Sequence, residues 1–223
     1  QLQSPKATYD TAYGFIERKC NGEEEPGQQW VDVTGETSTT TGETITYGVS
    51  LLNDSKYGFD VLDSDLRMSV LRSPIYAYHD PYKPEPNREY VYQDQGEQTV
   101  IYRLIPHAGQ WQNAEVSRRA WELNIRPFWV NEYAHAGDLP VNAAFVMIEP
   151  ANIVLSVCKV AEDSDTLIVR GYESTGVTTH AVLSLPTLAI RHEVVFQAHE
   201  IKTIAIDAKN HAITEVDLLE RPI

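Results

Sequence analysis

Residues 48–74, GVSLLNDSKYGFDVLDSDLRMSVLRSP, decide the fold of this chain. Around the start of this stretch, at positions 45–51, apolar and aromatic residues alternate with small ones, which is the period of two of a half-buried strand. The short polar side chains at 53–55 and again at 63–65 favour tight turns, because they hydrogen-bond to their own backbone. After the second turn, apolar and polar residues alternate again up to Pro74. Pro74 ends this last strand, because proline has no N–H to donate to a sheet. The stretch predicts a meander of three strands joined by two turns.

The charge and composition exclude several classes of protein. The formal net charge is −14, so a nucleic-acid partner is not expected, because such binding depends on lysine and arginine against phosphate. No apolar run approaches the roughly 20 residues of a membrane-spanning helix, and we expect no membrane partner. Cys20 and Cys158 are the only cysteines and form no metal-binding spacing. They indicate free thiols in a reducing compartment, and we expect the cytoplasm.

The remaining part of residues 1–141 predicts more strands, one long loop and one helix. Residues 75–95 are rich in tyrosine and proline, which is typical of an extended surface loop with a function of its own. The only convincing helix begins at a cap on Asn113, presents Val116, Ala120 and Leu123 on one face, and ends at Asn124. The further strands are expected at 6–16, 29–33 and 97–105.

The pattern changes after residue 144. Short alternating segments follow at regular spacing up to residue 223, separated by turn signals such as those at 162–165 and 174–176. This is typical of a small β-sandwich. We therefore predict two units, residues 1–141 and residues 142–223, in an all-β chain with one short helix.

No catalytic constellation is present in the sequence. It contains no HExxH, no GxSxG elbow and no phosphate-binding glycine loop, and its histidines are scattered. The four tryptophans (30, 111, 121 and 129) are candidates for stacking on sugars, although tryptophan more often packs in a core. The residues alone therefore indicate an acidic all-β region without catalytic apparatus.

Residues 48–74, called the hallmark stretch below, resemble a characteristic segment of the glycoside hydrolase family 38 α-mannosidases, in their bacterial and cytosolic branch. Further segments resemble the family in the same order along nearly the whole chain. They are ATYDTAYGFIER (7–18), QQWVDVTG (28–35), VIYRLIPHAGQW (100–111), AEVSRRAWELNIRP (114–127), VCKVAEDSDTLIVRGYES (157–174) and EVDLLER (215–221).

This resemblance implies a fold and an activity for a longer protein. The fold is the later part of a galactose-mutarotase-like β-supersandwich, followed by a small β-sandwich. The activity is that of a retaining mannosidase, which uses two carboxylates and a zinc ion held by histidine and aspartate residues. In the family these groups lie in a preceding catalytic domain. None has a counterpart here, so we assign no catalytic residue, no metal ligand and no bound cofactor to this chain.

What the resemblance leaves to this chain is support of the active site. Asn53 and Asp54 are expected to bond hydroxyls of an α-mannoside, and Tyr57 is expected to wall the pocket beside Lys56. Arg72 is expected to pair with a carboxylate across the domain junction. The competing interpretation is that Asn53 and Asp54 only form the turn and that Lys56 is solvated.

Three hypotheses follow. The first is an excised C-terminal β-region of an α-mannosidase that is inert alone, whose partner is the N-terminal catalytic domain of the same protein. The second is a stand-alone carbohydrate-binding module, and the third is an aldose epimerase, which rests on fold alone. A fragment that lacks neighbouring strands is also expected to expose apolar surface and to form homo-oligomers.

Overall fold

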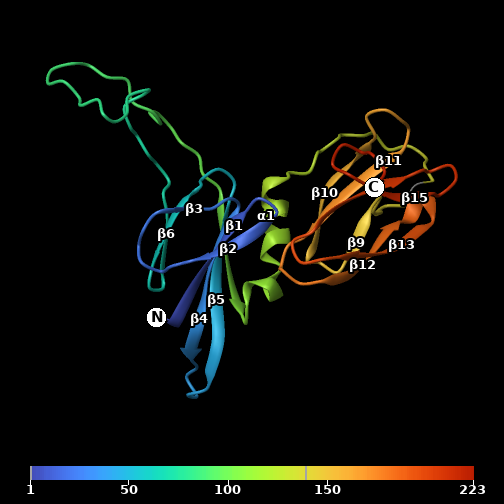
Figure 1. Cartoon of the computed structure of the whole chain (residues 1–223), viewed down its shortest axis with the longest axis horizontal. Helices are drawn as coiled ribbons and strands as arrows, with labels where there is room; N and C mark the ends of the chain where they lie inside the picture. Colours follow the sequence, from blue (N-terminus) through green and yellow to red (C-terminus); the bar gives the residue numbers. More distant parts are fainter. Residues whose placement is uncertain (1, 139) are drawn as a thin grey trace.

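The first half of the chain is built on one five-stranded antiparallel sheet. The structure, a computed structural model, describes residues 2–138 and 140–223. The strand order is β2-β1-β4-β5-β8, so that β2 and β8 are the edges (Figure 1). The strands are β1 (Gln3–Thr11), β2 (Gly14–Arg18), β4 (Trp30–Ser38), β5 (Thr44–Asn53) and β8 (Tyr102–Ala108).

The central hairpin of this sheet is longer than the sequence predicts. Strand β4 continues beyond the strand predicted at 29–33. It runs through residues 34–37 to Ser38, which pairs with Thr44. The segment predicted as one strand at 6–16 is instead the hairpin of β1 and β2, because Tyr13 adopts a left-handed backbone (φ 59°) and turns the chain. Strand β8 begins at Tyr102 and runs through Pro106 and His107 to Ala108, so it lies later in the chain than the strand predicted at 97–105.

A small three-stranded sheet covers one face of the large one. It consists of β3 (Glu25–Pro26), β6 (Gly58–Leu62) and β7 (Asp65–Met68). The predicted strands of the hallmark stretch are confirmed, but they do not form one meander. Strand β5 belongs to the large sheet and β6 to the small one, because the turn at 53–57 redirects the chain. The core between the two sheets comprises Ala7, Tyr9, Val31, Val33, Leu51, Phe59 and Val61.

The helical segment covers the other face of the large sheet. A 3₁₀ turn, η1 (Trp111–Ala114), precedes α1 (Val116–Asn124). The N-cap is Glu115 in a left-handed conformation (φ 54°), so the predicted cap at Asn113 is wrong. The reason is that the 3₁₀ turn must finish before the α-helix begins. The buried residues on this face are Trp30, Leu52, Trp111, Val116 and Ala120.

The C-terminal part is a sandwich of two antiparallel sheets, of order β10-β11-β14-β15 and β13-β12-β9. Both contribute to one apolar interior, with Val169, Leu183 and Ile204 at its centre. Within the second sheet, a short 3₁₀ turn, η2 (Pro186–Leu188), connects β12 to β13. The strands are β9 (Met147–Glu149), β10 (Ile153–Val160), β11 (Leu167–Glu173), β12 (Thr179–Leu185), β13 (Ile190–Phe196), β14 (Ile201–Ile206) and β15 (Ile213–Val216).

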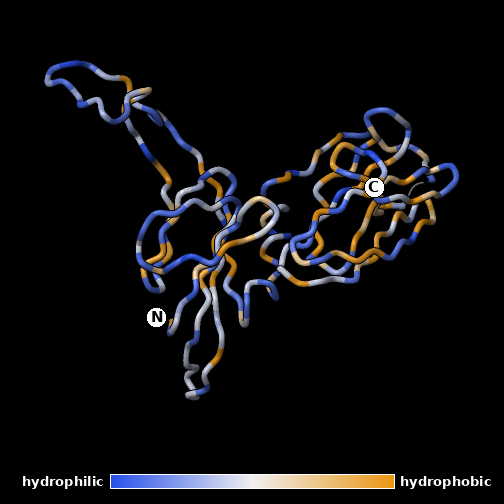
Figure 2. The backbone as a smooth tube through the Cα atoms, in the orientation of Figure 1, coloured by the Kyte–Doolittle hydropathy of each residue, from blue (hydrophilic) through white to orange (hydrophobic). Residues whose placement is uncertain are grey.

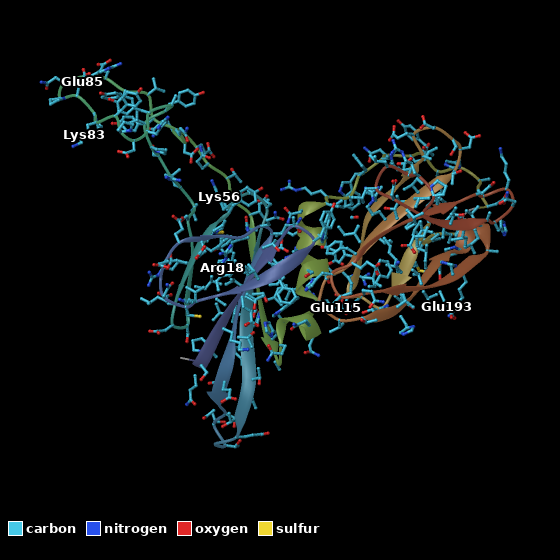
Figure 3. All side chains as sticks on the ribbon, viewed as in Figure 1. Arg18, Lys56, Lys83, Glu85, Glu115 and Glu193 are labelled. Atoms are coloured by element: carbon cyan, nitrogen blue, oxygen red, sulfur yellow. The ribbon has the colours of Figure 1, made fainter. Side chains whose placement is uncertain are left out.

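A long arm leaves the first half of the molecule between β7 and β8 (Figure 1). It contains the tyrosine- and proline-rich segment, and its only strand-like pairing is the isolated bridge between Ile75 and Tyr92. The prediction of an extended loop at 75–95 is thus confirmed. Hydrophobic and hydrophilic stretches follow each other along its length (Figure 2). In Figure 3, Lys83 and Glu85 lie at its far end and Lys56 lies where it departs from the body.

Side chains from both halves meet where α1 and the β1–β2 hairpin face the sandwich. The indole N–H of Trp121 donates to the hydroxyl of Tyr172 at 2.8 Å. Tyr13 packs edge-on against the same tyrosine ring, and Phe15 packs against His199.

The division of the chain into two units near residue 142 remains a prediction. None of the helices of the described residues is both long and apolar enough to cross a membrane.

Candidate functional site

The candidate site is the turn that follows β5, which holds Asn53 to Tyr57. Asn53 is almost fully buried. Its Oδ1 accepts the backbone N–H of Ser55 at 3.0 Å and that of Lys56 at 2.6 Å. Its Nδ2 donates to the carbonyl of Gln28 at 3.1 Å. The side chain therefore shapes the turn, as an asparagine at this position is suited to do.

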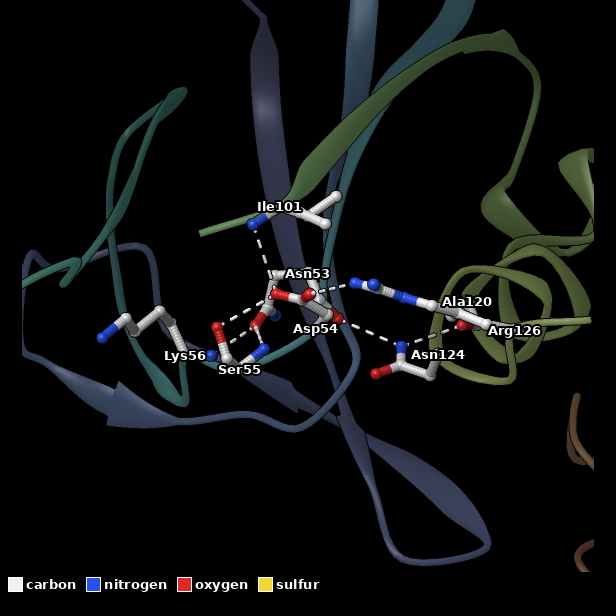
Figure 4. Close-up of polar contacts among 8 residues, drawn as sticks. All are labelled: Asn53, Asp54, Ser55, Lys56, Ile101, Ala120, Asn124 and Arg126. Carbon is white, nitrogen blue, oxygen red and sulfur yellow. Dashed lines mark hydrogen bonds and ion pairs between the residues drawn. The ribbon is translucent and has the colours of Figure 1, made fainter. Parts of the chain in front are cut away.

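Asp54 links the turn to two other segments (Figure 4). Its Oδ1 accepts the backbone N–H of Ile101, at the root of the arm, at 3.2 Å. Its Oδ2 lies 3.3 Å from Nη2 of Arg126, which follows α1. Asn124 completes the arrangement, because its Nδ2 donates both to the carbonyl of Asn53 and to that of Ala120. The turn is thus held by the helix end on one side and by the entry to β8 on the other.

An open cavity of about 480 Å³ lies beside this turn. Tyr57 forms one wall and is 59 % exposed, so its ring is free to contact a ligand. Among the other polar walls, the amides of Gln28 and Gln29 can donate and accept hydrogen bonds at once and suit the hydroxyls of a neutral ligand, whereas the Asn53 amide is buried and bonded within the turn. The lining residues are Pro26, Gly27, Gln28, Gln29, Asn53, Tyr57 and Asn124.

The predicted residues divide into two groups. Asn53, Asp54, Lys56 and Tyr57 lie together in the turn, whereas Arg72 lies beyond β7 at the start of the arm. Within the described residues neither Lys56 nor Arg72 forms an ion pair, so the pairing expected for Arg72 remains a prediction. The sequence does not point to Gln28, Gln29, Asn124 or Arg126 as residues of this site. The sequence around Asn124 indicates only the end of a helix, and nothing local connects it with a turn 71 positions earlier.

The tryptophans are mainly packing residues. Trp30 and Trp111 are buried against each other, with ring centroids 4.6 Å apart. Trp121 is half-buried and bonds to Tyr172. Trp129 alone is open to solvent, at 91 % exposure. The sugar-stacking interpretation therefore has no support at Trp30 and Trp111.

A buried aspartate, serine and histidine also lie together, but they form a structural network. Asp32 accepts hydrogen bonds from Ser50 Oγ at 2.6 Å and from Thr34 Oγ1 at 2.5 Å. His107 Nε2 lies 2.8 Å from the same Asp32 Oδ1 that Ser50 contacts. The serine thus bonds to the aspartate and not to the histidine, which is not the order that activates a nucleophile. The network joins β4, β5 and β8 beneath the helical segment.

A second buried carboxylate predicts a pH dependence. Asp10 is buried near the junction with the sandwich, and burial raises its pKa to about 7 although the backbone N–H of Gln29 donates to it. The folded state therefore favours the neutral acid. Stability is highest below the unfolded-state pKa near 3.8 and falls as the pH rises through about 7, by at most about 1.4 kcal/mol per pH unit for one group. We expect Asp10→Asn to remove this decrease.

The measurement is urea unfolding between pH 4 and pH 8. Asp165→Asn is the matched control, because its carboxylate is exposed and lies 3.8 Å from the exposed ammonium group of Lys209. If Asp10→Asn and the wild type lose stability equally over this range, Asp10 is not the group responsible.

Two family models match the chain. The glycosyl hydrolases family 38 C-terminal domain matches residues 1–87, and the glycosyl hydrolases family 38 C-terminal beta sandwich domain matches residues 152–223. Alpha-mannosidase G of Dictyostelium discoideum is 25 % identical over 224 residues, which span 96 % of this chain and 19 % of the relative. Alpha-mannosidase 2C1 of Homo sapiens is 30 % identical over 199 residues, which span 83 % of this chain and 17 % of the relative.

Solved structures share the fold. An alpha-mannosidase from Enterococcus faecalis V583 superposes with a TM-score of 0.71 at 18 % identity, over 93 % of this chain and 24 % of the other. A protein in the glycosyl hydrolase family 38 from Enterococcus faecalis gives the same TM-score of 0.71 at 20 % identity. The chain thus spans less than a fifth of the curated relatives described above, and about a quarter of these solved chains.

Proposed function

Because this chain belongs to glycosyl hydrolase family 38, as part of its C-terminal region, we propose that it supports and borders the active site of a retaining, zinc-dependent α-mannosidase. The longer protein, called the parent below, hydrolyses terminal α-mannosides in this proposal. The parent's N-terminal catalytic domain supplies the reacting groups and is the main partner of this chain. The two cysteines are both free, which is consistent with a cytoplasmic parent.

The zinc ion that the family resemblance implies does not fit this chain. Within residues 2–138 and 140–223, no group of three or more histidine, cysteine, aspartate or glutamate side chains is placed to hold a metal ion. In this proposal the zinc ligands lie in the parent's catalytic domain.

The observation that carries the proposal is the open cavity at the turn after β5. Its walls combine an exposed tyrosine face with amide groups, which is the chemistry that suits a pyranose: stacking on the C–H surface and hydrogen bonds to hydroxyls. Asp54, Asn124 and Arg126 hold the turn in place, so the wall is rigid before a ligand arrives. A rigid, non-reacting wall changes substrate affinity more than the rate of the chemical step.

Replacing Tyr57 by alanine in the parent tests this role. We expect KM for an aryl α-mannoside to rise about tenfold with kcat little changed, because one stacking contact of about 1.4 kcal/mol is lost from both ground and transition states. Tyr133→Ala is the matched control, since Tyr133 is an exposed tyrosine outside the cavity. An unchanged KM for Tyr57→Ala would remove this cavity from the active-site border.

The isolated chain is expected to be inactive. It should not hydrolyse an aryl α-mannoside even when zinc is added, and measurable turnover would overturn the assignment of all catalytic groups to the parent's other domain. The amide-lined cavity also favours the alternative of a carbohydrate-binding module. Calorimetric titration of the isolated chain with mannose separates the two: millimolar or tighter binding supports the module.

A further inference from the structure

Asn53, Asp54 and Ser55 form the motif Asn-x-Ser, with a residue other than proline in the middle. This is the acceptor motif for N-linked glycosylation, in which an oligosaccharide is attached to the amide of the asparagine. The chain contains nine asparagines, and none of the other eight is followed two positions later by serine or threonine. The motif by itself predicts that its asparagine lies on an exposed surface loop.

The structure places this asparagine in the interior instead. Asn53 is the last residue of β5 and is only 1 % exposed, whereas Ser55 is open to solvent. The amide oxygen of Asn53 accepts the N–H groups of Ser55 and Lys56, and its Nδ2 donates to the carbonyl of Gln28. Its backbone is held as well, because its N–H donates to the carbonyl of Gln29 at 2.9 Å. The amide that would carry an oligosaccharide is therefore covered and hydrogen-bonded in the folded chain.

The turn explains why these three residue types stand together. Asn53 closes the turn, and Asp54 ties it to Ile101 through two hydrogen bonds of 3.2 Å, one in each direction (Figure 4). Among the described residues, the hydroxyl of Ser55 is bonded only to Asp54 Oδ1, at 3.0 Å on the surface. The short polar residues that favour tight turns are the same types that make up the acceptor motif. The motif is thus a by-product of the turn, and the Ser55 hydroxyl can be removed without releasing another segment.

Attachment of an oligosaccharide is a substitution at the amide nitrogen. Nδ2 of Asn53 would attack the anomeric carbon of a lipid-linked oligosaccharide diphosphate, so that a bond between nitrogen and carbon forms while the bond from that carbon to the diphosphate oxygen breaks. One proton leaves Nδ2, and the lipid diphosphate departs with the bonding electron pair. The acceptor amide must enter the active site of an oligosaccharyltransferase for this step. Asn53 can do so only before the turn has formed, because it is buried afterwards.

A sugar on Asn53 would prevent the turn from closing. The sugar would be bonded directly to a side chain that is 1 % exposed, and it would have to stay in water because of its many hydroxyls. Asn53 would then have to leave its place at the end of β5. The N–H groups of Ser55 and Lys56 would lose their acceptor, which destabilises the turn. The wall of the cavity would be lost with it, because Tyr57 follows directly in the same turn.

We propose that Asn53 is a cryptic N-glycosylation site, which accepts an oligosaccharide in the unfolded chain and which, once modified, cannot form the turn after β5. The site is independent of the α-mannosidase activity, because it depends on how the turn folds and not on what binds beside it. It implies that the parent folds where no oligosaccharyltransferase acts, which agrees with the cytoplasmic location proposed above.

Glycosylation with a purified oligosaccharyltransferase and a lipid-linked oligosaccharide tests whether the acceptor is cryptic. The two substrates are the folded chain of residues 1–223, made in a bacterial host that lacks the enzyme, and a peptide of residues 50–58. We expect the peptide to be modified and the folded chain to react at least about 100-fold more slowly, because its amide becomes accessible only when the turn opens. The same peptide with Ser55→Ala is the control and should stay unmodified. An unmodified wild-type peptide, or a folded chain that reacts as fast as the peptide, overturns the proposal.

Secretion of the same chain from a eukaryotic host, behind an added signal peptide, tests the effect on folding. We expect the wild type to carry an oligosaccharide and to be retained, and Ser55→Ala to be secreted in several-fold greater yield without one. Ser55→Thr keeps the motif and should behave as the wild type. Urea unfolding of the wild type and Ser55→Ala from the bacterial host should give equal midpoints, which shows that the lost hydroxyl itself has no effect. Equal secretion of the wild type and Ser55→Ala, or a secreted glycosylated chain that unfolds at the same urea concentration as Ser55→Ala, overturns the proposal.

Discussion

Replacing Glu173 by alanine is expected to lower the free energy of unfolding of the C-terminal sandwich by about 4 kcal/mol. The carboxylate is completely buried at the end of β11. It accepts backbone N–H groups from Thr175 and Gly176, each at 2.7 Å, and from Val177 and His199, each at 3.1 Å. Alanine would leave these donors buried without an acceptor, and each such group costs about 1–3 kcal/mol.

Urea unfolding followed by circular dichroism measures the effect. Glu193→Ala is the control, because Glu193 lies on the outside of the sandwich (Figure 3) and forms an exposed ion pair with Arg191. We expect that control to stay within about 0.5 kcal/mol of the wild type. A loss of less than 1 kcal/mol for Glu173→Ala would mean that water replaces the carboxylate at this position.

The same carboxylate predicts the behaviour of the sandwich in acid. Burial opposes ionisation, but the donors from Thr175, His199 and Asn152 outweigh it, so the pKa of Glu173 is lowered from its ordinary value of 4.5. The stability that it contributes is therefore present above pH 4.5 and is lost as the pH falls through the lowered pKa. This is the opposite direction to Asp10, whose contribution is lost as the pH rises.

Replacing Gly48 by alanine is the second large effect, at about 3 kcal/mol. A Cβ at this position would overlap Thr34 Oγ1 and would lie only 2.5 Å from Cε1 of His107. Neither neighbour moves freely, because both are hydrogen-bonded to the buried carboxylate of Asp32. The substitution therefore breaks the network that joins β4, β5 and β8.

Gly14→Ala is the matched control for this prediction, because the nearest atom to its Cβ would be Nδ1 of His199 at 3.4 Å, an ordinary contact. The free energy of unfolding of both variants can be compared by thermal and urea denaturation. A Gly48→Ala protein that is as stable as Gly14→Ala would show that the sheet adjusts around the added methyl group.

Local patterns account for most of the strands that were predicted. The alternation at 45–51 and the turn residues at 53–55 and 63–65 place β5, β6 and β7 correctly, because the period of two and the turn chemistry depend only on neighbouring residues. The helix end at Asn124 follows from the same kind of local signal. The predicted cap at Asn113 is wrong, because an intervening 3₁₀ turn has no distinct sequence signature.

The long-range arrangement was not predictable in this way. Nothing near Asn53 indicates that β5 and β6 join different sheets or that Asn124 and Arg126 hold the turn. The same is true of the open cavity beside Tyr57, whose walls come from three separate segments.

The sequence by itself determined the all-β class, the positions of most strands, the exposed arm and the resemblance to family 38, because each depends on the identity and spacing of nearby residues. Only the tertiary structure decided which groups became buried partners. His107 reaches Asp32 across 75 positions, and Glu173 collects donors from segments up to 26 positions away. Such contacts form when sheet pairing and burial bring distant segments together, and the strength of each one depends on the exclusion of water that this packing produces.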